Sequence, residues 1–156
     1  MRISMIILMA LFFSASCTKG DRSSQESVEL ASASQEITVY KNPNCGCCTK
    51  WVDHMRENGF KLVEKPVNNL SEIKDSFGVP KDKRSCHTAV VGGYVFEGHI
   101  PAESIKKFLK AKSKDVGLVV PDMPMGSPGM EFGKHKDKFE VYSFDKSGQT
   151  KVFENY

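Results

Sequence analysis

The stretch YKNPNCGCCTKWVDHM, Tyr40 to Met55, places three cysteines within four residues where a strand gives way to a helix. Ile37 to Tyr40 alternates apolar and polar residues, which is typical of a strand, and Asn42-Pro43-Asn44 ends it. From Cys48 onward apolar residues recur at helical spacing, and Asn58-Gly59 indicates where this helix ends. The three cysteines are therefore predicted to lie at the start of the first long helix.

Cys45, Cys47 and Cys48 occupy a position where unpaired N–H groups and the helix dipole stabilise anions. We expect their pKa values to be lowered and their thiolates to be reactive or metal-binding. Cys45 and Cys48 have the C-x-x-C spacing of thiol redox proteins, a function for which Cys47 is not needed. The stretch alone leaves open a disulfide, a redox couple and a metal site.

The elements that follow predict an α/β fold. They are a strand over Phe60 to Val67, a helix over Leu70 to Phe77, a hairpin of Thr88 to Val91 with Tyr94 to Gly98, and a helix from Pro101. This order indicates thioredoxin-like topology, a mixed sheet flanked by helices. Near the end, Phe139 to Phe144 and Gln149 to Glu154 predict an added C-terminal β-hairpin, to which we assign no role.

A fourth cysteine, Cys86, precedes the strand that opens the predicted hairpin. In a thioredoxin-like fold this loop faces the start of the first helix, and redox proteins normally place a cis-proline there, whereas this chain has Cys86-His87-Thr88. Four thiolates can form two disulfides, an S4 zinc site or a copper(I) site. Adjacent Cys47 and Cys48 cannot easily point at one zinc ion, but they suit several soft ions bridged by shared sulfurs, and thiolates select copper(I). His87 either contacts this copper or hydrogen-bonds a turn.

The segment GLVVPDMPMGSPGM, Gly117 to Met130, is rich in proline and glycine and predicts an irregular loop. Met123, Met125 and Met130 either fill gaps against the core or supply thioether ligands and a dry cover for the thiolates. As a set beside four cysteines, they favour the second interpretation. His99, by contrast, is expected to order its own loop.

The N-terminal residues predict export. Residues 1–16 have the positive start, short apolar middle and small-residue end of a signal peptide, and the apolar run is too short to span a bilayer. Cys17 follows at the position of the acylated cysteine of a bacterial lipoprotein; the alternative is ordinary cleavage after Ser16. Residues 17–35 predict a flexible tether that carries this lipidated cysteine, which leaves residues 36–156 as one domain. We expect a periplasmic protein that is lipid-anchored to a bacterial membrane.

The formal net charge of +3 is small, and the lysines are interleaved with acidic residues. The chain has no basic stripe with interleaved aromatic residues, which a nucleic-acid-binding surface would need. Nucleic acid is therefore not an expected partner.

Three segments, NPNCGCCTKWVDHMRENGF, SCHTAVVGGYVFEGHIPAESIKKFL and GLVVPDMPMGSPGM, resemble in order and spacing the CopG-type copper-resistance proteins, long catalogued as a domain of unknown function. The resemblance covers Glu36 to about Phe132. It implies a thioredoxin-like fold and an extracytoplasmic location.

The copper site that the resemblance implies is built from Cys45, Cys47, Cys48 and Cys86. It also implies that copper changes oxidation state there, as in a copper oxidoreductase of metal detoxification. Met123 and Met130 fall on the family's loop pattern, whereas the position of Met125 is expected to vary.

We therefore interpret the chain as a lipid-anchored, thioredoxin-like protein that binds several copper ions and cycles them between Cu(I) and Cu(II). Besides copper, the expected partners are periplasmic copper-efflux or redox proteins and the membrane itself. One alternative is a thiol–disulfide oxidoreductase that uses Cys45 and Cys48, with Cys47 and Cys86 as resolving thiols. Another is a copper store or chaperone without turnover.

Overall fold

The computed structural model describes residues 36–156, the segment that the sequence assigns to one domain. The predicted signal peptide (1–16), the acylated Cys17 and the tether (17–35) lie outside the described residues. Within the described part of the chain, every helix is too short or too polar to cross a membrane.

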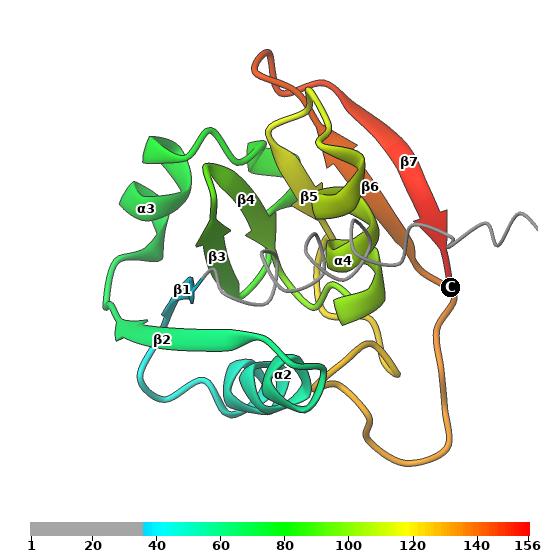
Figure 1. Cartoon of the computed structure of the whole chain (residues 1–156). Helices are drawn as coiled ribbons and strands as arrows, with labels where there is room; N and C mark the ends of the chain where they lie inside the picture. The colour runs from blue at the N-terminus through cyan, green and yellow to red at the C-terminus, as the bar shows by residue number, and fades with distance from the viewer. Residues whose placement is uncertain (1–35) are drawn as a thin grey trace, which may run out of the picture.

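In the described residues, strands of both orientations form one sheet in the order β2-β1-β3-β4-β5-β6-β7, accompanied by helices (Figure 1). The strands are β1 (Glu36–Lys41), β2 (Lys61–Pro66), β3 (His87–Val91), β4 (Tyr94–Glu97), β5 (Gly117–Val119), β6 (Glu140–Phe144) and β7 (Thr150–Asn155). The helices are α2 (Gly46–Glu57), α3 (Leu70–Ser76), α4 (Ala102–Ala111) and a 3-10 turn at Lys81–Lys83. The predicted α/β class is confirmed, and the thioredoxin-like assignment stays a prediction.

Two crossovers create the parallel pairs of the sheet. β1 and β2 run parallel and are joined through α2, and β4 and β5 run parallel and are joined through α4. Trp51 and Met55 of α2 share one buried cluster with Phe108 of α4 and with Phe96 of β4. Because successive strand residues point to opposite faces, the smaller cluster around Val95 lies on the other face of the sheet.

The two segments that carry the cysteines are attached at the same end of two neighbouring strands. β1 and β3 are antiparallel, and Lys41 at the end of β1 pairs with His87 at the start of β3. The loop after β1 therefore begins beside the point where the loop before β3 ends. One carries Cys45 and the other carries Cys86, which is the convergence that the sequence predicts.

The predicted elements are confirmed with small boundary shifts, except for β5. The prediction of an irregular loop from Gly117 to Met130 is wrong for its first residues, because Gly117–Val119 is a buried strand between β4 and β6. Gly117 permits this pairing, since a Cβ there would lie 1.7 Å from the Val95 carbonyl oxygen.

The C-terminal hairpin of β6 and β7 is present and extends the sheet beyond β5 (Figure 1). It packs against α4: the Phe153 ring lies 5.8 Å from that of Phe108, and Ser104 Oγ donates to Glu154 Oε2 over 2.7 Å. The hairpin is thus part of the domain's packed core.

Candidate metal centre

Cys45 ends the loop after β1 and caps α2. Its backbone is extended, with φ −81° and ψ 95°, and its Sγ accepts a hydrogen bond from the Cys48 N–H over 3.4 Å. The preceding turn is closed by Asn42, whose side-chain oxygen accepts from the Asn44 N–H over 2.9 Å. This turn brings the first cysteine to the N-terminus of α2, where the sequence predicted it.

The sulfur atoms of four cysteines lie within 4.8 Å of one another; they belong to Cys45, Cys47, Cys48 and Cys86. Cys45 and Cys48 form a disulfide with their Cα atoms 5.3 Å apart, whereas Cys47 and Cys86 are free thiols. Cys47 Sγ lies 3.5 Å from Cys45 Sγ, so a free thiol contacts the disulfide. The structure therefore brings together all the cysteines that the sequence selected within the domain.

Cys86 reaches this cluster from the loop before β3. Its backbone carbonyl oxygen lies 3.8 Å from Cys48 Sγ. Burial, and then the neighbouring Cys47 thiol, raise the pKa of the Cys86 thiol to about 12. Cys86 is therefore a protonated thiol at neutral pH in the metal-free protein, and a metal ion must displace this proton to bind.

His99 contacts the same thiol. Its Nδ1 lies 2.7 Å from the Pro128 carbonyl oxygen, and because a carbonyl can only accept, Nδ1 carries the proton. The Nε2 lone pair is then free and lies 2.9 Å from Cys86 Sγ, whose S–H donates to it. His99 orders its loop, as the sequence predicted, and it also presents a metal-ligating nitrogen to the cluster, a role that sequence reasoning missed.

His87, the histidine that the sequence selected, is fully buried beside the same thiol. Its Nδ1 lies 3.3 Å from Cys86 Sγ, and its Nε2 is buried without a hydrogen-bond partner. Burial holds the pKa of His87 well below its ordinary value, so the ring is neutral and can ligate a metal. Cys86, His87 and His99 form a second set of donor atoms within 4.8 Å of one another.

A buried ion pair lies behind the Cys86 loop. Glu97 is fully buried, and its Oε1 lies 2.5 Å from Lys74 Nζ. Oε1 also accepts from the Ser85 N–H over 2.7 Å, and Oε2 accepts from Thr88 Oγ1 over 2.7 Å. The carboxylate thus ties α3 and β4 to both sides of the Cys86 segment. Sequence reasoning missed this pair because no local pattern links positions 74 and 97.

The loop between β5 and β6, yellow to orange in Figure 1, descends from the sheet to α2. At Gly129, with φ +85°, a Cβ would lie 2.7 Å from the Cys47 carbonyl oxygen and 2.8 Å from the Trp51 nitrogen. Met130 follows directly in the chain and is half-buried. Met123 is 47% exposed and is not buried with the cysteines.

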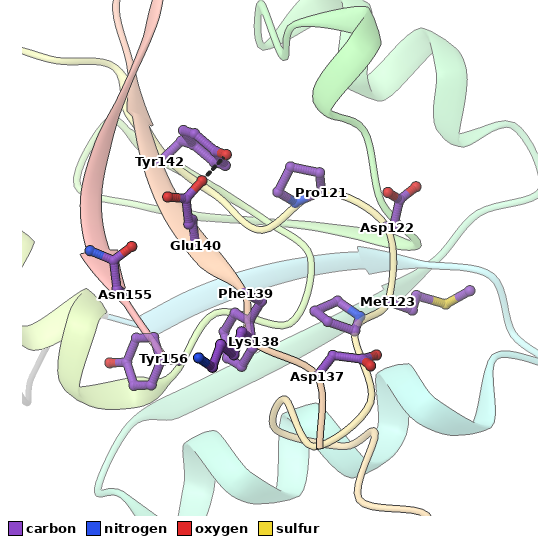
Figure 2. Close-up of a pocket in the computed structure, with 11 residues that line it drawn as sticks. Pro121, Asp122, Met123, Asp137, Lys138, Phe139, Glu140, Tyr142, Asn155 and Tyr156 are labelled. Carbon is purple, nitrogen blue, oxygen red and sulfur yellow. Dashed lines mark hydrogen bonds between the residues drawn. The ribbon is translucent and has the colours of Figure 1, made fainter. Parts of the chain in front are cut away.

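Met123 lies at a surface pocket of about 850 Å³ between this loop and the C-terminal hairpin (Figure 2). Its wall also includes Asp122, Asp137 and Tyr156, and Tyr142 donates a hydrogen bond to Glu140 there. No cysteine or histidine of the described chain lines this pocket. It is therefore separate from the cysteine cluster.

Comparisons with known proteins place these segments in context. A family described as a protein of unknown function, DUF411, matches residues 83–130, which include Cys86, both buried histidines and the methionine-rich loop. Two solved structures, titled copper resistance protein copG, form 2 and form 1, are each 42% identical to the chain. They cover 78% of it and 98% and 96% of their own chains, with TM-scores of 0.75 and 0.74. No curated protein matches the chain.

Proposed function

The chain belongs to the family of the copper resistance protein copG, and we propose that it binds copper at its cysteine cluster and interconverts Cu(I) and Cu(II) there. One observation carries the proposal: the sulfur atoms of Cys45, Cys47, Cys48 and Cys86 converge within 4.8 Å. Thiolates select copper(I), and sulfurs this close can bridge neighbouring ions. Copper is here the substrate, and the proposed site takes several ions once the disulfide is reduced.

The buried histidines support the redox part of the proposal. Neutral imidazole binds copper in both oxidation states, whereas thiolate favours Cu(I), so a mixed donor set can hold either state. Burial lowers the pKa of both His87 and His99, which keeps them neutral. Met130, in the loop between β5 and β6, is proposed as a thioether ligand. Met123, which is exposed, is proposed to receive copper from solvent.

We further propose that the protein works outside the cytoplasm and is anchored through an acylated Cys17. The support is the sequence pattern of residues 1–16 and the tether that follows. Cys17→Ser should release the protein from the membrane fraction or leave it unprocessed, because stable anchoring needs at least two lipid chains. Cell fractionation and mass analysis of the N-terminus check this. An unmodified Cys17 in a wholly soluble wild-type protein would contradict it.

A second candidate function, thiol–disulfide exchange, is favoured by the Cys45–Cys48 disulfide itself. An insulin-reduction assay separates the two functions. Turnover of insulin that Cys47→Ser leaves intact would favour the exchange enzyme. Transfer of copper to a chelator without any change of oxidation state would instead identify a store or chaperone.

The decisive experiment for the proposed function is copper content per chain after anaerobic loading of reduced protein. Because each bridging sulfur holds more than one ion, Cys47→Ser and Cys86→Ser should each lose most of the bound copper. Asp53→Asn, an exposed change on the same helix, is the matched control and should keep it. Full copper content and full cuprous oxidation in both cysteine variants would contradict the four-thiolate site.

A further inference from the structure

The four cysteines divide into two chemically different pairs. Cys45 at the N-cap and Cys48 three residues later lie on one side of the helix start, at a Cα separation of 5.3 Å that suits a disulfide. Cys47 and Cys86 come from different elements and keep free thiols. The structure therefore holds one oxidised pair and one thiol pair in a single cluster.

The two pairs are in contact. Cys47 Sγ lies 3.5 Å from Cys45 Sγ, and Cys86 Sγ belongs to the same set of sulfurs within 4.8 Å. An ion held between Cys47 and Cys86 would therefore lie next to the Cys45–Cys48 couple. Electrons need not cross any intervening residue to pass between them.

Oxidation of the couple leaves copper ligands in place. Cys47 and Cys86 stay as thiols, and the Nε2 lone pair of His99 lies 2.9 Å from Cys86 Sγ. His87 adds a buried Nδ1 that lies 3.3 Å from the same Sγ. Cys86 belongs both to the set with Cys47 and to the set with the two imidazoles, so sulfur and nitrogen donors suited to Cu(I) stay on either side of it.

We propose that the reduced Cys45/Cys48 pair is the electron donor that converts incoming Cu(II) to Cu(I), while Cys47, Cys86 and the buried histidines retain the product. Two S–H bonds break and one S–S bond forms; two Cu(II) ions each accept one electron, and two protons leave to solvent. A dithiol reductant of the compartment then restores the pair by exchange. The inference rests on the proposed function and adds to it a direction, Cu(II) to Cu(I), and a source of electrons.

The test uses reduced, metal-free protein freed of reductant under anaerobic conditions. It receives about two equivalents of Cu(II), the amount that one dithiol can reduce. A chromogenic cuprous chelator added after denaturation should find about two Cu(I) per chain. Peptide mapping after alkylation should find the Cys45–Cys48 disulfide, with Cys47 and Cys86 as thiols. A Cys47–Cys86 disulfide, with Cys45 and Cys48 alkylated, would overturn the inference.

Two variants test the same step independently. Cys45→Ser and Cys48→Ser each remove one half of the couple and should lose most of the cuprous yield, whereas the exposed control Asp53→Asn should keep it. A full yield in both cysteine variants would overturn the inference.

Direct loading of Cu(I) into reduced protein separates this inference from the proposed function. Wild-type protein that binds Cu(I) at the cluster and reduces added Cu(II) without oxidising Cys45 and Cys48 contradicts the inference alone. Protein that reduces Cu(II) through Cys45 and Cys48 but retains no Cu(I) contradicts the proposed copper site.

Discussion

Glu97 carries a carboxylate that is fully buried and paired with Lys74 at 2.5 Å. We predict that Glu97→Gln lowers the free energy of unfolding by about 3–5 kcal/mol, because it leaves the Lys74 ammonium buried without a counter-charge. Urea unfolding of the metal-free protein measures this. The Cys86 loop should also loosen, since Ser85 loses its charged acceptor.

Glu103→Gln is the matched control. Glu103 pairs with Lys106 at 2.9 Å on the surface, where the side chains are 64% and 41% exposed. Removing this pair should cost less than about 1 kcal/mol. Equal losses of unfolding free energy in the two variants would show that the buried Glu97–Lys74 pair stabilises the fold no more than a surface pair does.

Some site residues could be predicted from the sequence, and others could not. Three cysteines at a helix start are a local pattern, and Cys86 follows from topology, because the loop before β3 ends beside the start of the loop after β1. His99 was missed because its proton location depends on the Pro128 carbonyl, which comes from a different loop. In the sequence, Glu97 is an ordinary acidic residue at the end of a strand, and only the fold shows that Lys74 pairs with it.

The loop between β5 and β6 packs closely on the first turn of α2 at a single glycine. Gly129→Ala should be destabilising for two reasons: φ is +85°, and the new Cβ would lie 2.7 Å from the Cys47 carbonyl oxygen. The positive φ costs roughly 1–2 kcal/mol, and the collision should add about 1–3 kcal/mol. Unfolding free energy measures the sum, and faster alkylation of Cys47 should report that the loop has lifted from α2.

Gly148→Ala isolates the backbone contribution, because Gly148 has φ +81° but a Cβ at this position would meet no atom within 4 Å. Gly148→Ala should lower the free energy of unfolding only by the roughly 1–2 kcal/mol that the positive φ costs. It should leave the rate of Cys47 alkylation unchanged. If Gly129→Ala behaves like Gly148→Ala in both measurements, the loop does not cover the cluster.

Elements were predictable where a periodic pattern is long enough. α2 and the hairpins show clear apolar spacing, and their bounds agree with the sequence. β5 was missed because it has only 3 residues and precedes a run rich in proline and glycine. Its identity as a strand comes from pairing with β4 and β6 on either side, which is a property of the sheet and not of the segment.

The metal-free protein as a whole should be acid-labile. Burial lowers the pKa of three histidines, His54, His87 and His99, below the ordinary value of 6.5. As pH falls below about 6.5, these three rings take up protons in the unfolded chain before they do in the folded one, so their contribution to stability falls with pH. Each histidine contributes at most about 1.4 kcal/mol per pH unit. Urea unfolding on both sides of this pH measures the slope.

Two variants test whether the buried histidines cause this dependence of the free energy of unfolding on pH. His135→Gln alters a side chain that is 73% exposed and should keep the full pH dependence. His87→Phe should lose part of it. A stability that stays constant as pH falls would mean that the buried histidines do not control the acid response.

We propose that sulfur supplies most of the copper ligands. X-ray absorption at the copper edge, on full-length protein reduced and loaded anaerobically with Cu(I), measures the ligand set. The predicted result is a first shell dominated by sulfur, with a smaller nitrogen contribution from the buried histidines and a lower sulfur count in Cys86→Ser. A first shell of nitrogen and oxygen alone, unchanged in Cys86→Ser, would rule out a copper site made of these cysteines.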